Sequence, residues 1–586
     1  MTTRFGPLLD ETGTTFRLWA PSQTDVELQL ENRASLPLLR QKDGFWSCGV
    51  ADAGPGTRYR FHTAGLTFPD PASRRQATDT DGWSIVCEPP ARPPRQGPVR
   101  PWHETILCEV HVGAATPDGT FAALAERLEH FRDAGYTGLE LMPVNAFPGT
   151  RNWGYDGTLI FAPDAAYGPP EALRALVRRA HQLGLSIVLD VVYNHFGALH
   201  NFLPAYAPEI FDDAVATPWG AGIDFRQPMV RQFFYENAAM WLGDYDMDGL
   251  RLDAVHEMKS VAHDLFLGEL VKAARAAKPG AWLITENVTN KTHWLTRHED
   301  GTPVDFTAQW NDDFHHVLSF LVTGERKAGY EDTSRDPVAD IEKALADGFV
   351  HDGEADGQSD GRTRGEPASR LPMDAFIVYG QNHDQIGNRP DGRRIVDRVD
   401  ARRLDFMHFV MLLNPQIPLF FMGEEAHLRT GFPFFFDLPE PVAVEMRAER
   451  YRQMSAIFHE TVAEGALPDP NAPETFEAAK LDWTAFGREA HVQALVRFRE
   501  LVALRRERVW PLTATRYLDA WSARQGDGLI VTWAYEAGTL SMALNPTGGV
   551  ARMHFRTPCD AIVTGHFQRR GEEVTLEPWT AMVWRA

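Results

Sequence analysis

The sequence predicts a large parallel (β/α)8 barrel of the TIM type flanked by two small β domains. Three observations support this fold class. Short runs of alternating polar and apolar residues occupy residues 1–90, strand-like and helix-like segments alternate over residues 105–515, and short strands return over residues 516–586. With 586 residues the chain is long enough for two to four domains and a sizeable core.

The N-terminal region, residues 1–90, is expected to form an immunoglobulin-like β-sandwich. Its runs TTFRLWAP, DVELQL and TRYRFHT are separated by Gly, Pro and Asp, which is typical of short antiparallel strands. The proline-rich stretch CEPPARPPRQGPVRP lacks periodicity, so residues 91–104 are interpreted as a linker. The runs LIVTWAYE, TLSMALN and EPWTAMVWR predict a small C-terminal β domain over residues 516–586.

Eight strand candidates alternate with helices over residues 105–515. They are ILCEVHV, TGLELMPV, LSIVLDVVYN, DGLRLD, AWLITEN, TPVDFTAQW, FIVYGQN and IPLFFMG. The segments between the first three strand candidates have the apolar spacing of helices and end at Gly135 and Gly184: DGTFAALAERLEHFRDAG and PPEALRALVRRAHQLG. LSIVLDVVYN is almost wholly apolar, as a parallel strand covered on both faces should be. An open, doubly wound sheet is the alternative, but no GxGxxG or Walker lysine motif accompanies these strands.

Composition argues against several classes of partner. A net charge of -22 and a pI near 5.4 disfavour nucleic acid or an anionic membrane and suit a neutral ligand. No run approaches the ~20 apolar residues of a membrane span, and the N-terminus lacks a signal-peptide pattern, so we expect a cytoplasmic protein without a membrane partner. The cysteines lack metal-ligand spacing and are interpreted as reduced packing residues rather than disulfides: Cys48, Cys87, Cys108 and Cys559.

Charged and imidazole side chains follow four of the predicted strands, at the carboxyl ends where barrel enzymes carry their catalytic groups. The segments DVVYNH, RLDAVH, ITEN and QNHD bring six such residues to one rim: Asp190, His195, Asp253, Glu286, His383 and Asp384. Taken singly, each has a structural interpretation, such as a loop-capping aspartate, a satisfied histidine or an Arg251–Asp253 ion pair. Three acids in one cleft are costly unless chemistry uses them, because burial and like charges raise at least one pKa.

Retaining glycoside hydrolysis is a chemistry that needs this arrangement. One carboxylate attacks the anomeric carbon while a second, protonated acid donates to the leaving oxygen, at a separation of about 5 to 5.5 Å. In DGLRLDAVH, Arg251 and Asp253 alternate with Leu250 and Leu252, so the charged pair shares one face of the strand. Arg251 would keep Asp253 ionised. No redox cofactor or nucleotide is required.

The segments DVVYNH, GLRLDAVH, ITEN and QNHD, in this order, resemble the four short sequence regions of glycoside hydrolase family 13, the α-amylase family. The resemblance spans the whole barrel. It implies that Asp253 is the nucleophile, Glu286 the general acid/base and Asp384 the transition-state stabiliser. It further implies substrate-binding or supporting roles for Arg251, beside the nucleophile, and for the group His195, His383 and Asp190.

Other stretches are similar to the trehalose-releasing branch of this family. They are FPDPASR (68–74), NWGYDG (152–157), TPWGAGIDF (217–225), QNHDQIGNR (381–389), MGEE (422–425) and TFEAAKLDW (475–483). NWGYDG and TPWG also occur, in variant form, in branching and debranching members, which stay open as alternatives, as does a barrel that only binds carbohydrate. The residues after Glu425 in MGEEAHLRTGFPFFF depart from the family pattern, which puts the acceptor side in doubt.

That branch cleaves the α-1,4 bond next to the terminal trehalose of maltooligosyltrehalose. The resemblance therefore implies this substrate and related α-glucans, together with functional coupling to a maltooligosyltrehalose synthase. The acceptor-side candidates are His256, Glu257, Trp219, Phe225 and the loop 351–370, with Trp219 and Phe225 equally open to loop packing. Trp153 and Tyr155 are candidates for stacking on the donor-side glucose. No acidic loop has EF-hand-like spacing, and we expect neither a metal nor a cofactor.

Overall fold

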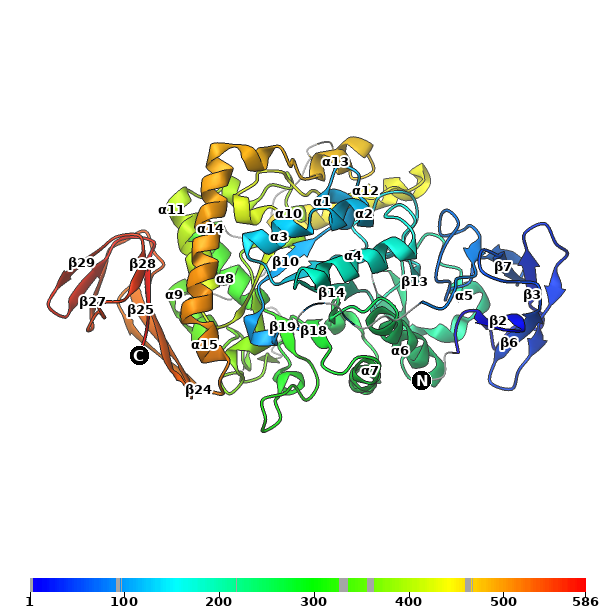
Figure 1. Cartoon of the computed structure of the whole chain (residues 1–586), viewed down its shortest axis with the longest axis horizontal. Helices are drawn as coiled ribbons and strands as arrows, with labels where there is room; N and C mark the ends of the chain where they lie inside the picture. The colour runs from blue at the N-terminus through cyan, green and yellow to red at the C-terminus, as the bar shows by residue number, and fades with distance from the viewer. Residues whose placement is uncertain are drawn as a thin grey trace.

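A closed barrel of eight parallel strands occupies the centre of the molecule, with one β domain at each end (Figure 1). The N-terminal domain, blue, and the C-terminal domain, red, lie on opposite sides of the barrel. The computed structural model describes residues 4–90, 95, 97, 99–217, 219–325, 336–355, 363–458, 465 and 467–586. The predicted fold class is confirmed.

All eight predicted barrel strands are present. Each pairs in parallel with the next, and the last pairs with the first, Leu107 lying opposite Leu419. The strands are β10 (Leu107–Val110), β11 (Gly138–Leu141), β14 (Ser186–Val191), β17 (Gly249–Leu252), β18 (Trp282–Glu286), β19 (Ala308–Trp310), β22 (Phe376–Val378) and β23 (Ile417–Phe421).

The alternation of side chains along these strands separates two cores. Val188, Ile284 and Leu419 belong to a small apolar cluster inside the barrel. Leu250 and Leu252 point outward into the main core, which the surrounding helices share. Arg251 lies between them in sequence and therefore points inward, as its place in DGLRLDAVH predicts.

Helices cover the outside of the barrel. The best defined are α4 (Pro170–Gln182), α6 (Pro228–Gly243), α7 (His263–Ala277), α8 (Asp312–Thr323), α11 (Ala401–Leu413) and α14 (Glu489–Arg508). The helix predicted over 118–135 is instead two, α2 (Phe121–Ala125) and α3 (Leu128–Ala134). The two helices are separate because the backbone N–H groups of Arg127 and His130 donate to the carbonyls three residues earlier, a 3-10 pattern that interrupts the α-helix. Gly135 ends α3 as expected, in the left-handed conformation.

The N-terminal domain is a sandwich of two antiparallel sheets. One has the order β1-β2-β6-β5 and the other β4-β3-β7-β8. The longer strands are β2 (Gly13–Trp19), β3 (Glu27–Leu30), β6 (Phe45–Val50) and β7 (Arg58–Thr63); β1 (Leu8–Asp10), β4 (Leu36–Pro37), β5 (Leu39–Arg40) and β8 (Leu66–Phe68) are short.

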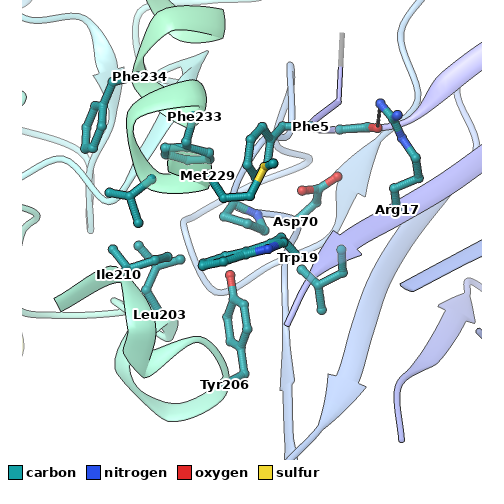
Figure 2. A pocket seen from close by; sticks show the side chains of 14 residues that line it. Phe5, Arg17, Trp19, Asp70, Leu203, Tyr206, Ile210, Met229, Phe233 and Phe234 are labelled. Carbon is teal, nitrogen blue, oxygen red and sulfur yellow. Dashed lines mark hydrogen bonds between the residues drawn. The ribbon is translucent and has the colours of Figure 1, made fainter. Parts of the chain in front are cut away.

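The sandwich docks on α6 of the barrel. The backbone N–H groups of Arg4 and Phe5 donate to the Glu236 carboxylate at 2.9 and 3.0 Å. The Phe5 ring meets Phe233 edge to face, with centroids 5.0 Å apart. Figure 2 shows the apolar pocket at this junction, with Phe5 and Phe233 side by side and the aromatic ring of Tyr206 below them. The sandwich is therefore packed on the barrel by apolar contact and anchored to it by hydrogen bonds.

The C-terminal domain has a five-stranded and a three-stranded sheet. Its strands are β24 (Tyr517–Gln525), β25 (Gly528–Tyr535), β26 (Gly538–Asn545), β27 (Ala551–His554), β28 (Ile562–Thr564), β29 (Phe567–Arg570), β30 (Glu573–Leu576) and β31 (Thr580–Arg585). The buried Trp533 indole N–H donates to the Leu345 carbonyl of α9 (Pro337–Ala346) at 2.8 Å, which joins the domain to the barrel helices.

The structure also bears on the predictions about cysteines and membrane spans, and all four cysteines lie among the residues that it describes. All four cysteines are free thiols; Cys108 is buried and Cys48 and Cys87 are half-buried, but Cys559 is exposed, so the packing interpretation is wrong for Cys559. Among the helices of the described residues, none is both long and apolar enough to cross a bilayer.

Candidate active site

Arg251 is the centre of the candidate site. Its side chain is 1% exposed, and it lies inside the barrel at the end of β17. One terminal guanidinium nitrogen donates to Asp190 at 2.8 Å and to Asp253 at 2.9 Å, and the second terminal nitrogen donates to Glu286 at 2.9 Å. The plane of the guanidinium lies over the Trp310 ring, 4.0 Å from its centroid. Strands β14, β17 and β18 thus deliver three acids to one arginine.

The two carboxyl groups that retaining hydrolysis requires differ in protonation. Burial raises the pKa of Glu286 to about 8, with Asp253 and Asp384 adding to the shift against the attraction of Arg251. Burial alone would raise the pKa of Asp253 as well, but Arg251 and His195 hold it below the usual value. At neutral pH one acid is therefore protonated and its neighbour ionised, although both contact the same guanidinium.

The backbone after β17 aims these groups. Ala254 has φ 36°, in the left-handed region, and its N–H donates to Oε2 of the Glu286 carboxyl group at 2.9 Å. The Asn194 amide donates to Asp253 Oδ2 at 2.8 Å, from the loop that follows β14. Asp253 therefore has one carboxylate oxygen held by Arg251 and the other by Asn194, which limits its rotation.

Asp384 sits in the first turn of α10 (His383–Gly387), where Asn382 forms a capping box with Gln385. The Asn388 amide donates to Asp384 Oδ1 at 2.7 Å. The buried Arg450 in turn donates to Asn388 Oδ1 at 2.6 Å and covers the Phe434 ring. The capping turn places Asp384 near enough to Glu286 for its charge to help raise the pKa of Glu286.

His383, Tyr155 and Asp190 form one wall of the site. The Tyr155 hydroxyl donates to Asp190 Oδ2 at 2.8 Å, and its ring stacks on His383 with centroids 5.1 Å apart. Burial raises the pKa of Asp190 to about 6, against the attraction of Arg251. The structure therefore brings these predicted residues together around Arg251.

His195 and Trp219 stack face to face, with centroids 3.7 Å apart. The Nε2–H of His195 donates to the Tyr155 carbonyl at 2.8 Å, and its Nδ1 lies against Asn194. In this arrangement both ring nitrogens face protein groups. Trp219 itself is 40% exposed. A direct sugar contact of either ring stays a prediction.

Two aromatic rings that the sequence offers as candidate sugar contacts are buried in the structure. Phe225 is 1% exposed and stacks on Phe266 of α7, centroids 4.1 Å apart, so it belongs to the core, the second of the two interpretations of this residue. Trp153 is 4% exposed. Phe432 stacks on its indole at 5.5 Å, and Gly387 approaches it so closely that a Cβ there would lie 2.0 Å from the ring. Both aromatic rings were predicted from sequence position, which does not reveal what covers them.

The acceptor-side candidates lie next to the nucleophile. His256 and Glu257 belong to a short 3-10 helix, Val255–Glu257, directly after β17. Both are half-buried, and Glu257 forms an ion pair with Lys259 at 3.0 Å. Of the loop 351–370, residues 356–362 lie outside the described residues. Its flanks pair as β20 (Glu354–Ala355) and β21 (Thr363–Arg364), and Arg364 donates to Asp313.

The stretch MGEEAHLRTGFPFFF lies behind the His383 wall. The Glu425 carboxylate is fully buried and bonded to His130 at 2.8 Å, while Phe432 packs on Trp153 and His111. The residues that depart from the family pattern in this stretch therefore pack against residues behind His383.

Three residues that hold the site together were not predicted. Asn194 lies within DVVYNH, Arg450 comes from α12 (Glu440–Phe458), and Glu109 is the third residue of the apolar strand β10. Glu109 is 1% exposed and accepts a hydrogen bond from the backbone N–H of His383 at 2.8 Å. A single charged residue in an inward register of the run ILCEVHV was the available signal.

One group among the described residues has metal-ligand spacing. Ligand atoms of Asp79, Asp81 and His200 lie within 4.8 Å of one another. Thr80 Oγ1 and His200 Nδ1 are 2.9 Å apart, and the Gly149 N–H donates to Asp79 at 3.1 Å. These contacts already join the sandwich to loops of the barrel. The expectation of no metal stays a prediction.

Comparison with known proteins places the chain in one family. Residues 72–208 match the model of the alpha amylase catalytic domain, and residues 4–79 match carbohydrate-binding module 48, the isoamylase N-terminal domain. The malto-oligosyltrehalose trehalohydrolase of Saccharolobus solfataricus is 32% identical over 93% of this chain and 94% of its own length. The chain belongs to the α-amylase family, in the malto-oligosyltrehalose trehalohydrolase group.

Other members of the family agree with this placement. The malto-oligosyltrehalose trehalohydrolase of Deinococcus radiodurans is 36% identical over 86% of this chain and 83% of its own length. A crystal structure of a Salmonella typhimurium protein assigned to the alpha amylases superposes with a TM-score of 0.91, at 35% identity over the full length of both chains. The resemblance read from the four rim segments is thereby confirmed, and the chain is a glycoside hydrolase.

Proposed function

We propose that this protein is a retaining hydrolase that cleaves the α-1,4 bond next to the terminal trehalose of maltooligosyltrehalose. The observation that carries the proposal is similarity, over 86 to 93% of this chain and at 32 to 36% identity, to relatives named malto-oligosyltrehalose trehalohydrolase. A protonated Glu286 beside an ionised Asp253 is the pair of groups that this reaction requires at its start.

In the first step, the Asp253 carboxylate attacks the anomeric carbon of the glucose on the donor side. Glu286 donates its proton to the glycosidic oxygen, and that C–O bond breaks, so trehalose leaves as a neutral alcohol. Arg251 stays beside the aspartate and the glutamate, and Asp384 faces the positive charge that develops on the sugar ring. The product of this step is a glycosyl ester of Asp253.

In the second step, water releases the sugar. Glu286, now ionised, accepts a proton from a water molecule, whose oxygen attacks the anomeric carbon and displaces Asp253. Glu286 regains its proton and Asp253 its charge, so the resting state is restored. The products are trehalose and a shortened maltooligosaccharide.

Selection of trehalose over linear maltose must depend on groups beyond the catalytic acids. Two glucoses joined α,α-1,1 form a kinked unit that linear maltose does not match. His256 and Glu257 follow the nucleophile strand directly, and Trp219 exposes part of its ring beside His195. We assign these three side chains to the acceptor side.

Three substrates tested separately distinguish the family members. Maltooligosyltrehalose should yield free trehalose, whereas linear maltopentaose and amylopectin should be consumed far more slowly. Brisk consumption of either glucan without trehalose release from the first substrate would favour a branching or debranching enzyme instead.

Variants of the nucleophile test the assigned mechanism and the purely carbohydrate-binding alternative together. Asp253→Asn should abolish turnover while sugar binding, measured by calorimetry, stays detectable. The matched control is Asp264→Asn on α7, whose side chain is 77% exposed and which should keep full activity. Undiminished turnover in Asp253→Asn would exclude its role as the nucleophile.

Functional coupling to a synthase and a cytoplasmic location belong to the same proposal. The substrate requires an enzyme that converts the reducing end of a maltooligosaccharide into an α,α-1,1 linkage. Co-expression with such a synthase should convert maltooligosaccharides to trehalose, and neither enzyme alone should do so.

A further inference from the structure

The buried carboxylate of Glu109, the third residue of β10, contacts His383 of the site without taking part in the two-step reaction. Glu109 is 1% exposed, at an inward-facing register position of the first barrel strand. Both of its oxygens are used on one partner. Oε2 accepts from the backbone N–H of His383 at 2.8 Å, and Oε1 is bonded to the Nδ1 of the same histidine.

This pair holds the His383 ring in one orientation. Tyr155 stacks on one side of the ring, and Trp153 meets it edge to face at 5.4 Å. Since Nδ1 is taken by Glu109, Nε2 is the ring nitrogen left for a ligand. With a carboxylate on Nδ1, the imidazole can carry a second proton, so that Nε2–H donates.

The charges around His383 favour that protonated form. The titratable groups that face it are Glu109 on β10, His111 after β10, Tyr155, Arg251 on β17 and Asp384 on α10. Burial alone would lower the pKa of His383, but Glu109, with Asp384 in support, raises it to about 9. Burial lowers the pKa of His111 to about 4, so that neighbour is neutral.

We propose that Glu109 is a positioning residue that keeps His383 doubly protonated, so that its Nε2–H donates a hydrogen bond to a hydroxyl of the sugar at the cleavage point. The donor role of His383 rests on the proposed function. The state of the ring in the free protein does not. In a neutral ring with its proton on Nδ1, Nε2 could only accept, and the direction of the sugar contact would reverse.

The substitution Glu109→Gln tests the charge while keeping the shape. Carbon-13 labelling of histidine and a pH titration of the free enzyme by NMR report the protonation of His383, whose signal is assigned by its loss in His383→Asn. The wild-type midpoint should lie at about 9. In Glu109→Gln it should fall by at least about one pH unit, because burial then acts against a weaker counter-charge.

The adjacent strand supplies a matched control. Glu140 lies opposite Glu109 in the β10–β11 register and is also 1% exposed. Burial raises its pKa well above the usual value. Glu140→Gln therefore makes the same chemical change without removing a charge, and it should leave the His383 midpoint in place.

Kinetics separate positioning from a merely structural role. Glu109→Gln should lower kcat/KM by about 10- to 100-fold, the effect of losing one charge-assisted hydrogen bond. The deficit should shrink at acidic pH, where His383 regains its second proton. In the background of His383→Asn, the Glu109 substitution should cost little more, because its effect passes through the ring.

The outcomes are distinct. An unchanged NMR midpoint in Glu109→Gln, or fully additive losses in the double variant, would overturn the positioning role. A shifted midpoint together with the absence of trehalose release by the wild-type enzyme would refute the proposed function and leave the Glu109–His383 pair standing.

Discussion

Raising the pH should inactivate this enzyme through Glu286. The general acid must hold a proton to release trehalose, and burial together with the nearby acids raises its pKa to about 8. The basic limb of the kcat/KM profile should therefore lie near pH 8. Asp312 is one of the acids that raise this pKa, so Asp312→Asn should move the basic limb to lower pH.

The magnitude follows from the titration of one group. With a pKa of about 8, roughly 90% of Glu286 is protonated at pH 7, half at pH 8 and about 9% at pH 9. The value of kcat/KM should thus fall about tenfold between pH 7 and pH 9. With the ordinary glutamate pKa of about 4.5, less than 1% would be protonated at pH 7, and activity would decline from pH 5 upward.

The assay is the initial rate of trehalose release from maltooligosyltrehalose at concentrations well below KM, between pH 5 and 10. Circular dichroism at each pH confirms that the protein stays folded. His383, with a pKa of about 9, should steepen the loss above pH 9, so His383→Asn should keep the limb near pH 8 without that steepening.

Two results would refute the reasoning. A plateau of kcat/KM that extends beyond pH 9.5 would mean that Glu286 is not the acid or keeps its proton far longer than its surroundings imply. A basic limb that stays in place in Asp312→Asn, and equally in the exposed control Asp264→Asn, would show that neighbouring carboxylates do not set the pKa.

Three further predictions concern stability. Glu286 stabilises the fold fully below its unfolded pKa of about 4.5, and this contribution is lost as the pH rises through its folded pKa of about 8. The unfolding free energy of the wild type, measured by urea titration relative to Glu286→Gln, should therefore fall across this window by at most about 1.4 kcal/mol per pH unit. Parallel curves for the two proteins would contradict this. Arg251→Met leaves Asp253 without its main counter-charge and should cost about 3–5 kcal/mol, whereas a loss below about 1 kcal/mol would show that the acids can do without it. Arg505 is fully buried and donates to three backbone carbonyls just before the start of β23. Arg505→Met should lower the unfolding free energy in urea by about 3 kcal/mol or more, yet leave kcat/KM unchanged at temperatures where the variant is folded. A kinetic defect at those temperatures would contradict a purely structural role.

Much of the fold follows from local pattern. Apolar runs bounded by glycine and proline specify the eight barrel strands, because a strand covered on both faces must be almost wholly apolar. The strict alternation in DGLRLDAVH places Arg251 and Asp253 inward, since side chains alternate along a strand. The three acids were predictable for a related reason, because parallel strands in a barrel end at one rim and bring their last residues together.

Only the tertiary structure decided which side chains support these acids and which are covered. Glu109 and His383 are 274 residues apart, and their pairing depends on barrel closure, which brings β10 and β22 to either side of β23. Trp153 and Phe225 are candidate sugar platforms in the sequence, but both are buried, Trp153 under Phe432 and Phe225 against Phe266. A periodic pattern in the sequence indicates on which side of its own strand a side chain lies. The pKa of Glu286 and the orientation of His383 depend instead on distances between strands far apart in sequence.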